Sequence, residues 1–176
     1  MMGFLWIFAS GSCLGIYCIL PLYLIKERGI DFDLANTLFG ISRMGGVLVS
    51  ILIGFLTDRY GYKIMLRLSL IATGLSTIAL SLASTLPLIL TTLILQATLS
   101  LAFFPAGLAA ISKLTPLSER SMAIGMIISI GMIFGTGFTP LLLGIIADHL
   151  SFQVGILCLG ILTTFSSLGV RLLGKI

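Results

Sequence analysis

Charged residues are scarce in this sequence. Only 9% of the 176 residues are Asp, Glu, Lys or Arg, whereas a soluble domain carries about 25%. The composition is 58% hydrophobic and the mean hydropathy is +1.21. A soluble fold of this length could not hide so much apolar surface, because every folded protein presents a surface to water. The composition excludes an ordinary soluble domain and indicates an integral membrane protein.

Groups that support catalysis or cofactor binding are equally rare. The sequence contains one histidine, His149, and three cysteines that lie in apolar runs at no metal or redox spacing. It has no phosphate-binding loop, no catalytic triad and no paired carboxylates within an apolar run. It also has no basic stripe with interleaved aromatics, which nucleic-acid binding would need. We therefore expect no enzymatic activity, no cofactor, no metal, no nucleic-acid partner and no ATPase of its own.

Long apolar runs fill most of the chain. About 20 mostly apolar residues are needed to cross the hydrocarbon core of a bilayer as a helix. Six runs have this length, at roughly 3–25, 34–57, 64–83, 87–112, 121–146 and 151–172. They lack the alternation typical of a membrane β-barrel, and a helix satisfies its backbone hydrogen bonds internally. We predict an all-α membrane protein with six transmembrane helices, the first of which is retained rather than cleaved as a signal peptide.

Lysine and arginine are unevenly distributed among the breaks between these runs. If the N-terminus is cytoplasmic, the inner loops hold seven basic residues and the outer loops hold two. The inner set is Arg59, Lys63, Arg67, Lys113, Arg120, Arg171 and Lys175, and the outer set is Lys26 and Arg28. Cytoplasmic loops carry an excess of Lys and Arg. We predict a multi-pass protein of the cell (inner) membrane with both termini in the cytoplasm.

The ends of the second and fifth runs resemble each other. The segment Gly54–Asp58 recurs 90 positions later as Gly144–Asp148. The two aspartates fall on opposite sides of the membrane, because an odd number of runs separates them. This pattern predicts a 3+3 inverted repeat with units of about 1–83 and 84–176, a plan found in many secondary transporters.

A cluster of glycine and charge joins the second and third runs. It reads Gly54-Phe55-Leu56-Thr57-Asp58-Arg59-Tyr60-Gly61-Tyr62-Lys63. The spacing resembles the cytoplasmic signature of a half of a major facilitator superfamily transporter, with Tyr62 in a place that is usually basic. The segments 104–106 and 116–120 also resemble this family, and the resemblance covers essentially all 176 residues.

The resemblance implies a gating role for five residues of this cluster. Gly54 and Gly61 would allow close approach of helices and a tight turn. Asp58 would face a helix N-terminus or basic residues, and Arg59 and Lys63 would pair with Asp58 or with a second acid in the 116–120 loop. The alternative is that these charges only fix topology and solvate a loop.

Full members of the family have twelve helices in two halves, so this chain resembles one half. Leu93 stands where N-terminal halves often have an arginine, three residues before Gln96, and Thr139-Pro140 stands where antiporters have Gly-Pro. Both departures favour a C-terminal half. The resemblance implies a second six-helix half as partner, which is a separate chain, a missing segment or a second copy. A start without a basic flank favours a fragment.

Arg43 is the most unusual residue of the apolar runs. It falls about ten residues into the second run, near mid-membrane depth, where an arginine costs about 3 kcal/mol or more. On a continuous helix it would share a face with Asn36, Gly40, Ser50 and Gly54. No acidic residue lies within any run. An unpaired cation in a cavity suits an anionic solute; the alternatives are backbone carbonyls, snorkelling or an acid in the missing half.

Two further polar residues are candidates for solute binding, Tyr17 and Gln96. In the family resembled, the helices equivalent to the first, second, fourth and fifth runs line the pathway, and the other two support them. Pro21 and Pro105 sit late in the first and fourth runs, and each removes a backbone hydrogen bond. The resulting bends would either help to gate the pathway or be static kinks.

These features predict a secondary transporter that moves a small solute by alternating access against a second half. An organic or inorganic anion is the favoured solute class. The alternative is an integral membrane scaffold or assembly subunit that transports nothing.

Overall fold

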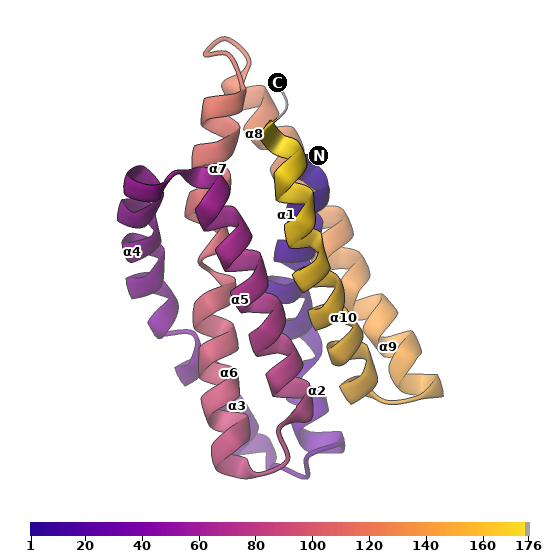
Figure 1. Ribbon diagram of the computed structural model, residues 1–176. Coiled ribbons are helices and arrows are strands. Elements are labelled where there is room, and N and C mark those ends of the chain that lie inside the picture. The colour runs from indigo at the N-terminus through magenta and orange to yellow at the C-terminus, as the bar shows by residue number, and fades with distance from the viewer. Residues whose placement is uncertain (175–176) are drawn as a thin grey trace.

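The computed structural model describes residues 1–174, and every regular element in that range is a helix (Figure 1). Six helical stretches are long and apolar enough to cross a membrane, and we call them the first to sixth spans. They are Met2–Lys26, Phe32–Tyr60, Tyr62–Leu82, Leu86–Leu114, Arg120–His149 and Phe152–Leu173. The predicted all-α architecture with six transmembrane helices is confirmed.

The spans run alternately up and down, and both chain ends lie at the same end of the bundle (Figure 1). We call this the terminal end and the opposite one the far end. The junction between the second and third spans lies at the terminal end, whereas the junction between the fifth and sixth lies at the far end. Asp58 and Asp148 are therefore at opposite ends of the bundle.

Four of the six spans are interrupted near their middles. The first span consists of α1 (Met2–Ser10), the π-helical segment η1 (Gly11–Gly15) and α2 (Ile16–Lys26), and the second of α3 (Phe32–Ser42) and α4 (Gly45–Tyr60). The fourth span consists of α6 (Leu86–Ser100) and α7 (Phe103–Leu114). The fifth span consists of α8 (Arg120–Ile130), the π-helical segment η2 (Gly131–Gly137) and α9 (Phe138–His149). The third span is the single helix α5 (Tyr62–Leu82). The sixth is α10 (Phe152–Ser166), which continues as the 3₁₀ segment η3 (Ser167–Gly174).

Prolines account for two of these interruptions. A proline inside a helix lacks the N–H that would bond to the carbonyl four residues earlier, and its ring clashes with that carbonyl. Four residues before Pro105 is Leu101, where α6 has just ended. Four residues before Pro140 is Thr136, inside η2. Pro21, in contrast, lies within α2 without ending it.

The second span breaks without a proline. The Arg43 N–H donates to the Gly40 carbonyl at 3.4 Å and the Met44 N–H to the Ile41 carbonyl at 3.1 Å. These are bonds between residues three apart, the tighter 3₁₀ pattern, and α4 resumes at Gly45. The sequence pattern predicted that Arg43 shares one continuous helical face with Ser50 and Gly54. The break in the helix shows that it does not.

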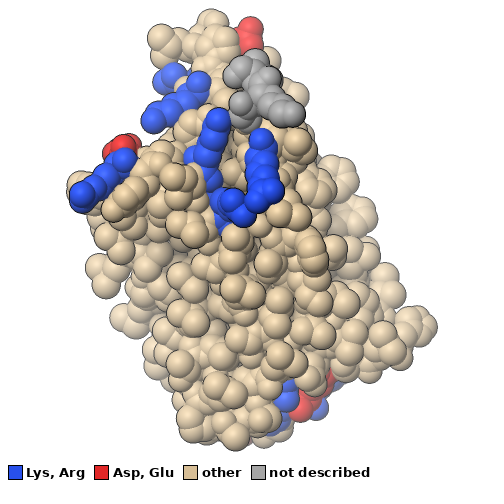
Figure 2. Space-filling model, viewed as in Figure 1, with Lys and Arg blue, Asp and Glu red and all other residues tan. Residues whose placement is uncertain are grey.

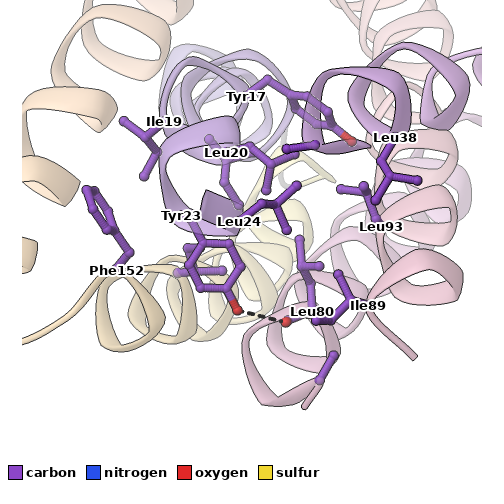
Figure 3. Packing of buried hydrophobic residues seen from close by; sticks show 14 of the residues in the cluster. Tyr17, Ile19, Leu20, Tyr23, Leu24, Leu38, Leu80, Ile89, Leu93 and Phe152 are labelled. Carbon is purple, nitrogen blue, oxygen red and sulfur yellow. Dashed lines mark hydrogen bonds between the residues drawn. The ribbon is translucent and has the colours of Figure 1, made fainter. Parts of the chain in front are cut away.

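A buried polar layer separates two hydrophobic clusters. The cluster toward the far end gathers large side chains such as Tyr23, Leu80 and Phe152, and the Tyr23 hydroxyl donates to the Leu80 carbonyl at 3.4 Å (Figure 3). The cluster toward the terminal end is built around Trp6 and Phe103. The layer between them includes Ser10, Ser12, Ser42, Thr73, Thr77, Gln96, Ser100, Thr139 and Thr163, all buried. The layer therefore concentrates buried hydroxyl and amide groups between the two apolar clusters.

The third and sixth spans are in especially close contact. A β-carbon built at Gly74 would lie 2.8 Å from the Gly160 carbonyl oxygen, and one built at Gly160 would lie 3.0 Å from the Gly74 carbonyl oxygen. Small residues let helix backbones approach in this way inside a membrane. These two spans are also the ones without a break at mid-depth.

Charge is divided between the two ends of the bundle. Figure 2 shows Lys and Arg gathered at the terminal end and a smaller, mixed group of both signs at the far end. The surface between them carries no visible Asp, Glu, Lys or Arg on this face. This is the distribution that a helical membrane protein requires.

Candidate solute site and gating segment

Two aromatic rings lie against the Arg43 guanidinium at the break in the second span. The Arg43 Cζ atom is 4.4 Å from the centroid of the Tyr17 ring and 5.9 Å from that of Phe39. Tyr17 belongs to α2, so this contact joins the first and second spans. The structure brings together two of the three predicted solute-binding residues, Arg43 and Tyr17.

The rings offset part of the cost of placing Arg43 at this depth. A guanidinium over an aromatic face gains about 0.5–2 kcal/mol, with the larger values where water is excluded. An arginine at the centre of a transmembrane helix costs about 2.5–3.5 kcal/mol on insertion scales. Arg43 is half-buried. The rings therefore offset only part of this cost.

The Tyr17 hydroxyl adds a second unused polar group at this position. Tyr17 is only 4% exposed, and its hydroxyl has no hydrogen-bond partner among the described residues. The nearby Ser42 hydroxyl donates instead to the Phe39 carbonyl, at 2.9 Å. A buried polar group without a partner costs about 1–3 kcal/mol. Because this hydroxyl is buried, contact between it and a solute requires the surrounding helices to move, and that contact remains a prediction.

Gln96 lies apart from Arg43, in the polar layer. Its Nε2 atom donates to the Ser12 carbonyl at 2.7 Å and to Thr77 Oγ1 at 3.3 Å, and Ser12 Oγ is 2.5 Å from Thr163 Oγ1. These bonds join the fourth, first, third and sixth spans. Gln96 is fully buried, and its Oε1 atom has no partner among residues 1–174. Contact between Gln96 and a solute therefore requires these spans to separate, and it remains a prediction.

The glycine–charge segment occupies the junction of α4 and α5. Gly61 has φ 87° and ψ 150°, a conformation open almost only to glycine, so this residue makes the tight turn as predicted. Gly54 differs from expectation, because a β-carbon there would meet nothing within 4 Å. The side of Gly54 on which a β-carbon would lie is therefore open within the described chain, and the close contact predicted there would need a partner outside it.

The charges of this segment point into solvent. Asp58, Arg59 and Lys63 are exposed, and the Arg59 guanidinium lies 5.6 Å from the Tyr60 ring centroid. Within residues 1–174 no ion pair joins Asp58 to Arg59 or Lys63. Asp58 sits near the C-terminal end of α4, where the helix dipole disfavours an acid. An external partner would therefore stabilise it.

A clamp that the sequence did not reveal closes the far end. The Glu27 carboxylate accepts hydrogen bonds from the backbone N–H groups of Phe152 and Gln153, the latter at 2.9 Å, at the N-terminus of α10. Arg28 donates to the Tyr23 hydroxyl at 2.7 Å and to the Ser81 carbonyl at 2.6 Å. The residues after α2 thus tie the first span to the ends of the third and sixth spans.

One contact of Arg43 could have been predicted from the sequence, whereas the contacts of Glu27 could not. Phe39 stands four residues before Arg43, a spacing at which side chains meet on a helix, so it could have been found. The partners of Glu27 lie 125 and 126 positions away, and nothing in the sequence marks that contact.

An apolar cavity elsewhere in the bundle does not include Arg43 in its lining. It has a volume of about 310 Å³ and lies between the first, fifth and sixth spans, with a mostly apolar lining that includes Phe8, Leu142 and Cys158. It holds no charged residue. It therefore offers no site for an ionic group.

Comparison with known proteins agrees with this architecture. The multidrug resistance protein MdtG of Escherichia fergusonii is 34% identical over 137 residues, which cover 74% of this chain and 32% of that protein. The sugar efflux transporter A of Dickeya chrysanthemi is 39% identical over 62 residues, which cover 35% of this chain and 16% of that protein. The chain thus spans about a third or less of the length of these relatives.

The family assignment rests on almost the whole chain. Residues 3–175 match the family described as Major Facilitator Superfamily. The match includes the glycine–charge segment and all six spans. The chain is a multi-pass membrane protein that belongs to the major facilitator superfamily.

Proposed function

We propose that this chain is one half of a secondary transporter, and that it binds an anionic group of a small solute at Arg43 and Tyr17. The observation that carries the proposal is the half-buried guanidinium over the Tyr17 ring, whose buried hydroxyl has no hydrogen-bond partner among the described residues. A cation and a hydrogen-bond donor together suit a carboxylate or another small anion.

The interruptions of four spans support transport by alternating access. Many transporters bind solute near the bilayer midplane, where discontinuous helices meet. Here the first, second, fourth and fifth spans are all interrupted at that depth, and Arg43 lies at one of the breaks. The two continuous spans would support the four spans that line the proposed pathway. This division matches the roles that the family resemblance implies.

We also propose that residues 1–83 and 84–176 form two inverted repeat units. Gln96 stands 84 positions after Ser12, as Pro105 does after Pro21. Gln96 bonds to Thr77 and Ser12 bonds to Thr163, and these two threonines are 86 positions apart. The packed glycines Gly74 and Gly160 of the third and sixth spans are also 86 positions apart. Equivalent positions therefore make equivalent contacts.

A second six-helix half is the proposed partner. In the hydrophobic windows of the second and fifth spans only 17% and 22% of residues are buried, against 67% in the first. The uncovered faces are apolar and include Val47, Leu48, Ile51, Phe55, Ile133 and Leu141. A second half lying against them would also bring a partner to Gly54 and Asp58. The sequence departures at Leu93 and Thr139 favour assigning this chain to the C-terminal half.

The proposed orientation follows from the charge division. The terminal end carries most of the basic residues, so it would face the cytoplasm of the cell that holds the protein in its inner membrane. The glycine–charge segment would then gate the cytoplasmic side.

The test is solute uptake into liposomes by this chain reconstituted with its second half. A charge-assisted hydrogen bond contributes about 1.5–3 kcal/mol, so Arg43→Gln should lower uptake of an anionic solute by about 10- to 150-fold. Arg43→Lys should recover part of it. Lys113→Gln, which removes an exposed cation outside the site, should have little effect. Equal anion uptake by wild type and Arg43→Gln, for every anion tried, would remove the anion proposal.

A second candidate is a neutral solute or a drug-like compound. It is favoured by the names of the two relatives, a sugar efflux transporter and a multidrug resistance protein. Uptake of a neutral sugar that persists in Arg43→Gln, with no anion transported, would favour it. An assembly subunit would instead crosslink to a partner through position 43 and support no transport of either class.

A further inference from the structure

A basic pocket opens between the third and sixth spans at the terminal end. It has a volume of about 210 Å³ and is lined by Lys63, Ile64, Arg67, Val170 and Arg171. Three of the five lining residues are cations, and no acid lines the pocket. Figure 2 shows blue side chains gathered over this end of α5 and the adjacent C-terminal part of the chain.

Among the residues that the structure describes, no acid lines this pocket beside its three cations. The Arg67 Nε atom is buried and has no hydrogen-bond partner among the described residues. Cations that converge in a partly desolvated pocket repel one another, and a bound anion would relieve that repulsion. Guanidinium groups match the oxygen atoms of phosphate with two parallel hydrogen bonds. The lining residues therefore suit a phosphate group.

The surface beside the pocket distinguishes a lipid from a free phosphate. Ile64, Leu68 and Leu75 form an exposed apolar stripe on α5, at spacings that keep them on one face. Phe165, Leu168 and Leu172 form a similar stripe on α10 and η3. Figure 2 shows that the surface below the basic cluster carries no Asp, Glu, Lys or Arg on this face. A phospholipid would occupy both regions, with its headgroup in the pocket and its acyl chains along the stripes.

We propose that this pocket binds the phosphate headgroup of an anionic phospholipid. In the proposed orientation the pocket lies on the cytoplasmic side, where basic pockets between transmembrane helices are suited to such headgroups. The site lies on the two continuous spans, away from Arg43 and Tyr17, so it does not depend on the proposed transport. Lys63 contributes to the pocket and lies two residues after Gly61, so a bound lipid would also hold the turn between α4 and α5.

The test is native mass spectrometry of the purified chain in detergent with equimolar phosphatidylglycerol and phosphatidylcholine. The wild type should retain phosphatidylglycerol preferentially. Each Lys or Arg near an anionic membrane contributes about fivefold to binding, so the double variant Arg67→Gln/Arg171→Gln should lower the preference about 25-fold. Arg67→Lys/Arg171→Lys should keep most of it. If the double variant does not fold, Arg171→Gln alone, an exposed position, should still show about a fivefold loss.

The matched control removes two cations from the same end of the bundle but outside the pocket. Arg59→Gln/Lys113→Gln should leave the preference unchanged. An equal loss in both double variants would show attraction to the whole basic surface and overturn the proposal, as would a wild type without preference. Millimolar inorganic phosphate distinguishes the two sources of the anion: a phosphate that binds alone and displaces the lipid completely would show a free-anion site instead.

Discussion

Replacing Gly74 by alanine tests how closely the third and sixth spans are held together. The new β-carbon would lie 2.1 Å from Thr164 Oγ1, 2.7 Å from the Thr164 backbone nitrogen and 2.8 Å from the Gly160 carbonyl oxygen. The threonine hydroxyl can rotate away, but the other two atoms belong to the backbone of α10. Reaching an ordinary contact of 3.4 Å requires the Thr164 nitrogen to move by about 0.7 Å.

The expected magnitude combines two opposing effects. Overpacking a well-packed site costs about 1–3 kcal/mol, whereas alanine gains about 1 kcal/mol over glycine within a helix. Gly144→Ala isolates the second effect, because a β-carbon at Gly144 in α9 would meet nothing within 4 Å. We therefore expect Gly74→Ala to be less stable than Gly144→Ala by about 1–3 kcal/mol in free energy of unfolding.

Unfolding can be followed by the fluorescence of Trp6, the one tryptophan of the chain, on addition of a denaturing detergent. Gly160→Ala should behave like Gly74→Ala, because it would meet the Ile78 nitrogen at 2.9 Å. The double variant should cost less than the sum of the two, because both residues share one contact. A Gly74→Ala protein as stable as Gly144→Ala would show that the spans do not pack at this distance.

Two further predictions concern the ends of the bundle. Glu27→Gln removes the charge that faces the N-terminus of α10, so we expect it to lower the free energy of unfolding by about 0.3–2 kcal/mol in the same assay. The control Asp148→Asn, at an exposed position of the same end, should change this free energy little. An equal loss in both variants would argue against the Glu27 clamp. Gly61→Ala places a β-carbon on a residue at φ 87° and should cost about 1–3 kcal/mol. Gly54→Ala serves as its control for stability, since its β-carbon position is open, and a Gly61→Ala protein as stable as this control would contradict the turn assignment.

The spans could be predicted from the sequence because crossing a bilayer requires long, uncharged apolar runs, and few other features produce them. The interruptions were only partly predictable. Pro105 marks the break in the fourth span directly, since its ring conflicts with the carbonyl of Leu101. The break at Arg43 has no proline beside it, and only Gly45 and Gly46 indicate that the helix is weak there. Hydrophobic pattern therefore locates a transmembrane helix but does not show whether it is continuous.

The candidate site shows the same limit. The sequence marked Arg43 because a cation at mid-depth is costly, and it gave Tyr17 as a further candidate. It did not show that the Tyr17 ring lies against the guanidinium, because that contact depends on how the first and second spans cross. It also named Gln96 as a candidate for solute binding, but it did not show that the buried Gln96 amide bonds the first and third spans. The sequence shows how deep in the membrane a polar residue of an apolar run lies, but the residues that it contacts depend on tertiary packing.

The contacts between spans indicate which parts of this chain move together. Three sets of contacts hold the third and sixth spans to each other or to the rest of the bundle. The Gly74–Gly160 approach joins these two spans to each other. The hydrogen bonds of Gln96 and Ser12, and those of Glu27 to α10, join them to the first and fourth spans. The outward faces of the second and fifth spans make no such ties and expose large apolar side chains. An internal rearrangement would break several hydrogen bonds at once, whereas sliding along the uncovered faces would break none of them. The proposed alternating access would then be a movement of the whole six-helix unit against its proposed partner, with few changes inside the unit.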